Sequence, residues 1–416
     1  MRTRKSWANY HPLMAHALLL SAIGALCVIL YRPICQHNPM GFDFRDYDIS
    51  ATAARQGHDS YSLTGAIGLS ERLYGLSPAQ AASDLAGRPN MADPFTTVLV
   101  STVAWLPPSL AYLTWLALLL MALVASLWGV ARLWPLGSWT LARLCAFAAS
   151  PMVFWSLYLG QTTVLVLAAW VATLGLLRRR APFLAGLVLA GGLALKPQLL
   201  AGPAVLLAVV LWSQRARWRR LILGCVCGLA AAIAVVEVFA EPGTLGHWLA
   251  LIGQAGARMA VFDDVSSLST FYVLHWPRAL VVLNAATIVA WALLCLGLWL
   301  RQGWRDPRAW LFQGSVLWLL ATPYVHSHDN LVLLPALWLF WRGRRDHRLD
   351  RILDLAVLAV WWIAPYATMT NATRLIPGIQ GLGILVPVTL AVAAFVAGSR
   401  DDSARQTPTE PSLVLS

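Results

Sequence analysis

About twelve long apolar stretches, joined by short polar segments, run through this chain and limit its fold more than any other feature. A helix needs about 20 mostly apolar residues to cross the hydrocarbon core of a bilayer. Hydrophobic residues make up 58% of the chain and charged residues only 12%, about half the charge of a typical soluble domain. So little polar surface cannot cover a soluble globule. We therefore expect an all-α, polytopic integral membrane protein. The same composition excludes a disordered chain, a coiled coil and a secreted disulfide scaffold.

These stretches predict about 12 transmembrane helices, within a range of about 10 to 13. They lie near 13–31, 109–131, 144–159, 162–177, 182–195, 198–213, 221–240, 279–300, 309–321, 330–341, 352–366 and 376–397. A further apolar segment, 94–106, ends at a pair of prolines and is predicted to be re-entrant or interfacial. The first helix has a basic start but no small-residue cleavage site, so we expect it to be retained rather than removed as a signal peptide.

The placement of arginine predicts how the helices are oriented. With the N-terminus in the cytoplasm, 22 of the 31 basic residues but only 7 of the 19 acidic residues fall in inner segments. Cytoplasmic loops carry the excess of Lys and Arg, so both termini are predicted to be cytoplasmic. The arginines are spread among short loops, whereas a nucleic-acid site gathers them on one face. We therefore expect no nucleic-acid partner.

We expect one transmembrane domain over residues 1–397, with long outer loops at 32–92 and 241–278. Residues 398–416 are polar and are predicted to form a disordered cytoplasmic tail. The six cysteines lie mostly within apolar runs, and Cys225 and Cys227 are too close together for an ordinary zinc site. We interpret all six as packing residues.

The unusual polar residues all fall at the outer face in this orientation. They are Asp43, Asp46, Asp48, Gln161, Lys196, Asp263, Asp264, His326, His328 and Asp329. The inner loops offer little besides arginines, which the orientation already explains. A functional site at the outer interface, where the lipid headgroups lie, is the simplest interpretation.

Two of these groups have simpler alternatives. The three aspartates of 43–48 either belong to a site or only cap a solvated helix, where carboxylates suit the helix dipole. The spacing of Asp46 and Asp48 also matches a nucleotide-sugar metal motif that is common by chance. Lys196 interrupts an apolar run, where a cation is costly unless it is paired or its side chain reaches the headgroups. A phosphate or carboxylate partner for Lys196 is the favoured interpretation.

The turn 321–330 places two histidines and an aspartate between two apolar helices. His326, His328 and Asp329 would suffice in number for a metal, but their spacing is unspecific. An ordinary polar turn is the simple alternative, and substrate handling is favoured. Asp263 and Asp264 are interpreted as a helix cap. No metal site and no cofactor are expected.

Five segments, taken in order, resemble glycosyltransferase family 87, the membrane glycosyltransferases that depend on a polyprenyl-phosphate sugar. They are Asp43-Phe-x-x-Tyr47 with Gly57 and Tyr61; Pro94-Phe through Leu106-Pro-Pro with Trp115; Gly160-Gln161-Thr-Thr; Ala185-Gly186 leading to Lys196-Pro197; and Thr322-Pro323-Tyr324 ending in Asp329, before Pro335-Ala336. No single motif is specific for the family, but the occurrence of all five in the same order over residues 41–341 is fairly specific. Asp93 stands where family members often have Tyr, and His326 where an aromatic residue is usual, and these departures bear on the acceptor and the sugar.

The resemblance implies a GT-C fold, with catalytic groups on the first outer loop. It implies that a sugar, best known as mannose, moves from a polyprenyl phosphate to an acceptor hydroxyl with inversion. Asp43 is the candidate base, with His328 or Asp46 as alternatives, and Lys196 is the candidate that steadies the departing phosphate. Gln161 and His328 are candidates to orient sugar hydroxyls or phosphate oxygens. Tyr47, His326 and Asp329 join Asp46 as further substrate-binding candidates.

The expected partners are the lipid-linked donor, a lipid or glycan acceptor and membrane lipids. The expected location is the bacterial cytoplasmic membrane, with the active site facing outward. Two rival functions remain: a transporter or flippase of lipid-linked sugars, and a polymerase or ligase of polyprenyl-linked glycans. A flippase favours polar groups near the bilayer midplane or in broken helices of matched halves, whereas this cluster is expected at one face.

Overall fold

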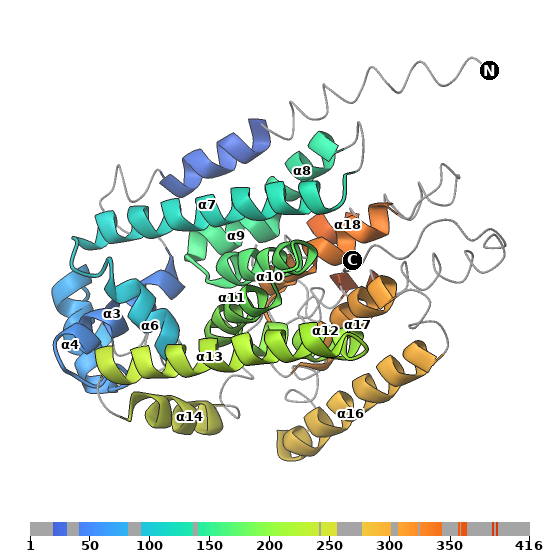
Figure 1. Ribbon diagram of the computed structural model, residues 1–416. Coiled ribbons are helices and arrows are strands. Elements are labelled where there is room, and N and C mark those ends of the chain that lie inside the picture. Colours follow the sequence, from blue (N-terminus) through green and yellow to red (C-terminus); the bar gives the residue numbers. More distant parts are fainter. Residues whose placement is uncertain are drawn as a thin grey trace.

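The computed structural model describes residues 20–30, 41–81, 93–135, 140–240, 243–255, 277–300, 307–322 and 325–342, with a few residues between 357 and 389. Every regular element in these ranges is helical, as expected for an all-α membrane protein (Figure 1). Two predicted features, Asp263 with Asp264 and the tail 398–416, lie outside the described residues.

The elements follow the chain in a simple order. They are an apolar helix Leu20–Leu30, α3 (Phe42–Arg55), α4 (Leu63–Tyr74), α6 (Pro94–Ser101), α7 (Pro108–Leu133), α8 (Thr140–Ala148), α9 (Pro151–Leu159), α10 (Thr163–Arg178), α11 (Pro182–Leu195), α12 (Pro197–Leu211), α13 (Arg215–Phe239), α14 (Thr244–Ala255), α16 (Leu280–Leu298), α17 (Pro307–Ala321), the 3-10 helix η5 (Ser327–Leu333) and α18 (Leu334–Arg342). Proline begins six of them, because its fixed φ suits the first turn and its missing N–H has no partner there anyway.

Three of the described helices are long and apolar enough to cross a membrane: α7, α13 and most of α16. The helices α9 and α10 together pass the same test, but the chain bends by 115° between them. Several predicted spans match shorter apolar helices, such as α11 with 14 residues and α12 with 15. At about 1.5 Å per residue these are shorter than the roughly 30 Å of hydrocarbon.

Four helices form the centre of the protein in a layered order. The helix α10 packs against α7 on one side and α11 on the other, and α11 packs against α13 (Figure 1). The contact between α11 and α13 is a backbone contact: a Cβ on Gly186 would lie 2.1 Å from the carbonyl oxygen of Leu221, and one on Gly224 equally close to that of Phe183. Small residues at such crossings let helices pack closely in a membrane, where apolar side chains gain little from leaving lipid.

The described part of the predicted first outer loop, residues 41–81, is largely helical. It contains α3 and α4, which gather with α6 at one end of the protein (Figure 1). The segment 94–106 contains α6, an eight-residue helix that is too short to cross a bilayer. This length is compatible with the predicted re-entrant or interfacial segment. The predicted second outer loop likewise contains α14. These helices are too short to be predicted as membrane spans, because none of them is longer than 14 residues.

Candidate functional site

Two glycines bring the start of α3 against the end of α9. Gly41 precedes α3 with φ 110°, and a Cβ there would lie 2.9 Å from the carbonyl oxygens of Tyr158 and Leu159. Gly160 ends α9 with φ 77°, and a Cβ there would lie 2.7 Å from the Cβ of Phe44. Glycine alone adopts these conformations at little cost and leaves room for the close approach. Asp43, in the first turn of α3, therefore lies beside the residue that follows Gly160.

The end of α9 is held by hydrogen bonds from α7. The indole N–H of Trp115 donates to the carbonyl oxygen of Gly160 at 2.8 Å, and the hydroxyl of Tyr112 donates to that of Tyr158 at 3.0 Å. Both side chains are buried. These bonds satisfy carbonyl groups that the end of a helix leaves unpaired, and they fix the turn that carries Gln161.

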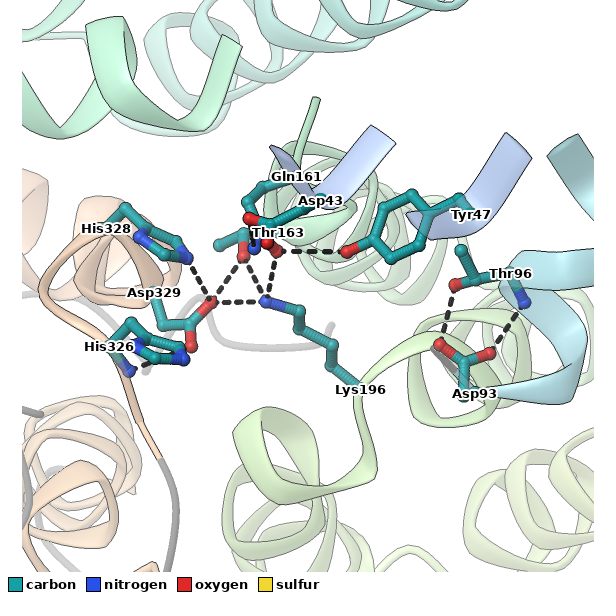
Figure 2. Close-up of polar contacts among 10 residues, drawn as sticks. All are labelled: Asp43, Tyr47, Asp93, Thr96, Gln161, Thr163, Lys196, His326, His328 and Asp329. Carbon is teal, nitrogen blue, oxygen red and sulfur yellow. Dashed lines mark hydrogen bonds and ion pairs between the residues drawn. The ribbon is translucent and has the colours of Figure 1, made fainter. Parts of the chain in front are cut away.

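Lys196 occupies the single-residue joint between α11 and α12, and its ammonium group is buried and fully hydrogen-bonded (Figure 2). Its Nζ donates to Gln161 Oε1 at 2.7 Å, to Thr163 Oγ1 at 2.9 Å and to Asp329 Oδ1 at 2.7 Å. An ammonium group has three protons to donate, so all three are used. Lys196 is therefore paired with a carboxylate, which is one of the two kinds of partner that the sequence predicts for it.

Asp329, in η5, is the anionic partner of this ammonium, and its side chain has no exposed surface. Its Oδ1 also accepts a hydrogen bond from the Thr163 hydroxyl, and its Oδ2 accepts one from the backbone N–H of His326 at 3.0 Å. Burial by itself raises the pKa of this carboxyl, but Lys196 and the two neighbouring histidines outweigh it and hold the pKa below its ordinary value. Asp329 is therefore ionised and occupied by its neighbours, which suits a partner of Lys196 better than a base.

Gln161 joins this ion pair to Asp43. Its amide oxygen accepts from Lys196, and its amide N–H donates to Asp43 Oδ2 (Figure 2). The hydroxyl of Tyr47 is directed at the same amide oxygen, at 3.4 Å. Burial raises the pKa of Tyr47 well above its ordinary value, and the nearby carboxylates, Asp43 first, raise it further. Tyr47 is thus a neutral donor beside Asp43, which is itself only half-buried.

His328 is a buried imidazole whose two ring nitrogens have no hydrogen-bond partner among the described residues. Its Nε2 lies 3.8 Å from Asp329 Oδ1, beyond hydrogen-bond distance, and its ring stacks on that of His326 at 5.1 Å. Burial lowers the pKa of His328 well below its ordinary value, so the ring is neutral. A buried polar group without a partner is costly, so these two nitrogens beside Lys196 and Asp329 are able to hydrogen-bond a ligand.

The structure separates the three aspartates of α3. Asp43 joins the cluster, whereas the carboxylate of Asp48 accepts a hydrogen bond from the hydroxyl of Tyr74 on α4 at 2.7 Å. Asp46 is half-buried, and its backbone carbonyl accepts from Ser50. The spacing of Asp46 and Asp48 matches a metal motif, but the two carboxylates have different surroundings, because the carboxylate of Asp48 lies between α3 and α4. In the part of the chain that the structure describes, no three His, Cys, Asp or Glu residues are grouped to hold a metal.

Sequence reasoning did not select Thr163 or Asp93 as site residues. Thr163 begins α10 and bridges Lys196 and Asp329. Asp93 caps α6 by accepting from the backbone N–H and the hydroxyl of Thr96, each at 2.6 Å (Figure 2). Burial raises the pKa of the Asp93 carboxyl to about 7, although the bonds to Thr96 and the charge of Lys196 oppose the shift. The sequence places both residues in segments that resemble the family, but a threonine beside a glutamine and an aspartate before a proline are too common to be assigned a role from sequence.

The model of glycosyltransferase family 87 matches residues 93–323, more than half of the chain. The match contains Gln161, Thr163 and Lys196, whereas α3 with Asp43 precedes it and Asp329 follows it. Neither the search of curated proteins nor the search of solved structures found a match.

Proposed function

Because this chain belongs to glycosyltransferase family 87, we propose that it moves a sugar from a polyprenyl-phosphate donor to an acceptor hydroxyl at the outer face of a bacterial cytoplasmic membrane. Mannose is the proposed sugar, and a lipid or a glycan is the proposed acceptor. The proposal includes cytoplasmic termini and about twelve spans, of which the described helices provide the centre. It needs neither a metal nor another cofactor, because Lys196 supplies the positive charge.

One observation carries this proposal. The half-buried carboxylate of Asp43 and the buried ammonium of Lys196 bind opposite ends of the same amide, that of Gln161. A base and a cation are therefore separated by one side-chain amide. Glycosyl transfer from a phosphodiester needs a base for the acceptor hydroxyl and positive charge for the departing phosphate, and this cluster holds both.

The proposed step requires no strong acid. The acceptor hydroxyl gives its proton to Asp43 as its oxygen forms a bond to the anomeric carbon. The bond from that carbon to the phosphate oxygen breaks, and the electron pair leaves with the polyprenyl phosphate. Lys196 stabilises this anion, which is already a weak base. A single displacement of this kind inverts the anomeric centre.

The other residues of the cluster take supporting roles in this proposal. Asp329 holds the side chain of Lys196 in place, and the unpaired ring of His328 offers a hydrogen bond to a phosphate oxygen or a sugar hydroxyl. Tyr47 and His326 line the same cluster and complete the binding site with Asp46. His328 is the second candidate for the base, and its neutral ring is in the right protonation state for that role.

Transfer by the purified protein in nanodiscs tests the function. The protein receives radiolabelled polyprenyl-phosphate mannose and a lipid and glycan extract of its host, and the products are separated. We expect label in a new product with the wild type. Asp43→Asn removes the base and is expected to slow transfer by about 10²- to 10⁴-fold, while donor binding is retained.

The neighbouring aspartate provides a matched control. Asp46→Asn changes the same charge on the same helix. Because Asp46 is proposed to bind substrate and not to act as the base, the variant is expected to raise KM far more than it lowers kcat. Loss of transfer in Asp46→Asn but not in Asp43→Asn would move the base to Asp46. If the wild type moves label across a sealed bilayer without making a product, the protein is a flippase. Growth of a long glycan on one lipid would instead identify a polymerase.

A further inference from the structure

Every proton of the Lys196 ammonium is already bound, so a donor phosphate has to displace one of its three partners. Asp329 is a buried ion-pair partner, and an ionised carboxylate left unpaired in the interior is costly. Thr163 is held from both sides, because it also donates to Asp329. Gln161 is the remaining neutral acceptor, and it faces Asp43. A phosphate that approaches from the side of Asp43 therefore displaces the amide of Gln161 first.

The same amide is the group that occupies the base. Its N–H donates to Asp43 Oδ2, while its oxygen accepts a charged hydrogen bond from Lys196. A hydrogen bond at one end of an amide polarises it and strengthens the bond at the other end. The bond from Gln161 to Asp43 is therefore strongest when Lys196 holds the amide oxygen, which is the state without donor.

We propose that Gln161 is a positioning residue that couples the phosphate site to the base: it binds Asp43 in the free enzyme and releases it when the donor phosphate takes its place on Lys196. This inference rests on the proposed function. It predicts that the donor binds before the acceptor is activated. An enzyme that frees its base only after the donor is bound keeps the two substrates in a fixed order.

The release of Asp43 by Gln161 is expected to change the pH dependence of transfer in a known direction. A hydrogen bond to a carboxylate stabilises its ionised form, so the bond from Gln161 lowers the pH at which Asp43 titrates in the free enzyme. The titratable groups that surround this position are Asp46 on the same helix, Asp93 from α6, Lys196 from the joint of α11 and α12, and His326, His328 and Asp329 from the turn that forms η5, with neutral Tyr47. The variants below leave all of these groups in place.

The pH profiles of transfer distinguish the free enzyme from the donor complex. The acid limb of kcat/KM for the donor reports the free enzyme, and that of kcat reports the complex. Gln161→Met fills the same space without a hydrogen bond. It is expected to move the acid limb of kcat/KM upward by about one pH unit, and to leave the acid limb of kcat where it is in the wild type.

Thr163→Val is the matched control, because it removes the other neutral partner of Lys196 without contacting Asp43. It is expected to change the KM for the donor and to leave both acid limbs unmoved. Gln161→Asn keeps the amide on a shorter side chain. It is the second variant to measure if Gln161→Met folds poorly, and it is expected to show the same shift of the acid limb of kcat/KM. An unmoved limb of kcat/KM in both Gln161 variants, or the same shift in Thr163→Val, would overturn the coupling.

Proton uptake provides a second measurement that needs no acceptor. The donor is a phosphodiester and does not itself titrate near pH 5. Binding of polyprenyl-phosphate mannose in weak buffer at that pH is expected to draw protons onto the wild type, fewer onto Gln161→Met and none onto Asp43→Asn. Absence of transfer by the wild type would refute the proposed function. Wild-type transfer with equal proton uptake in Gln161→Met would refute only the coupling.

Discussion

Lys196 combines two tasks at the scale of a single residue: it neutralises Asp329 in the interior, and it is proposed to hold the donor phosphate. Lys196→Ala leaves a buried carboxylate without its cation, which costs about 3 to 5 kcal/mol. We expect this variant to lose donor use far more than Lys196→Arg, which keeps the charge but not the compact shape. Transfer rates and donor KM for the two variants measure the difference.

A double variant separates the two tasks. Lys196→Met with Asp329→Asn removes both charges of the pair, so it should recover most of the thermal stability that Lys196→Met loses. It should not recover donor binding, because nothing replaces the ammonium. Recovery of transfer in the double variant would show that the pair only stabilises the fold, and equal activity of Lys196→Ala and Lys196→Arg would return Lys196 to a structural role.

At the scale of elements, α3 presents Asp43 and Asp48 to different neighbouring segments. Asp43 meets α9 and α10 through Gln161, whereas Asp48 meets α4 and is buried there. Burial raises the pKa of Asp48 to about 6, although the bond from Tyr74 opposes the shift. The folded protein therefore binds this proton more tightly than the unfolded chain does. Its contribution to stability is present below about pH 4 and is lost as the pH rises through about 6.

Asp48→Asn tests this sign. The amide oxygen still accepts from Tyr74, but it carries no charge, so the variant should be more stable than the wild type by roughly 2 kcal/mol at pH 8 and equal to it below pH 4. Melting temperatures in nanodiscs at the two pH values measure the effect. Tyr74→Phe removes the donor instead, and it should lower the melting temperature at pH 8. A gain for Asp48→Asn that is the same at both pH values would contradict the titration of this carboxyl.

At the scale of the whole molecule, the distribution of arginines predicts which ends of the helices face outward. Gln56, after α3, is exposed on the predicted outer side, and Gln214, before α13, is exposed on the predicted inner side. In a chain with its own cysteines removed, Gln56→Cys should react with a membrane-impermeant maleimide in intact spheroplasts, and Gln214→Cys only after the cells are opened. The native cysteines have to be replaced first, because Cys27 and Cys227 are exposed thiols. The reverse labelling pattern would place the site in the cytoplasm.

The sequence alone determined the class of the molecule, because the low charge and long apolar runs leave only the bilayer as a solvent. It also located most helices in the described ranges, and α11 over 182–195 agrees at both ends, since proline and Lys196 mark them. It selected seven of the residues that meet in the cluster, because a polar group in an apolar chain is expensive and therefore conspicuous.

Tertiary structure alone decided how these residues are connected. Asp43, Gln161, Lys196 and Asp329 come from four segments far apart in the chain, and nothing in their spacing shows that one amide joins two of them. The close approach at Gly160 depends on Phe44, which lies more than a hundred residues earlier, and the difference between Asp43 and Asp48 depends on which helix each faces. Burial and hydrogen-bond partners set the chemistry of each group, and both arise only when distant segments pack together.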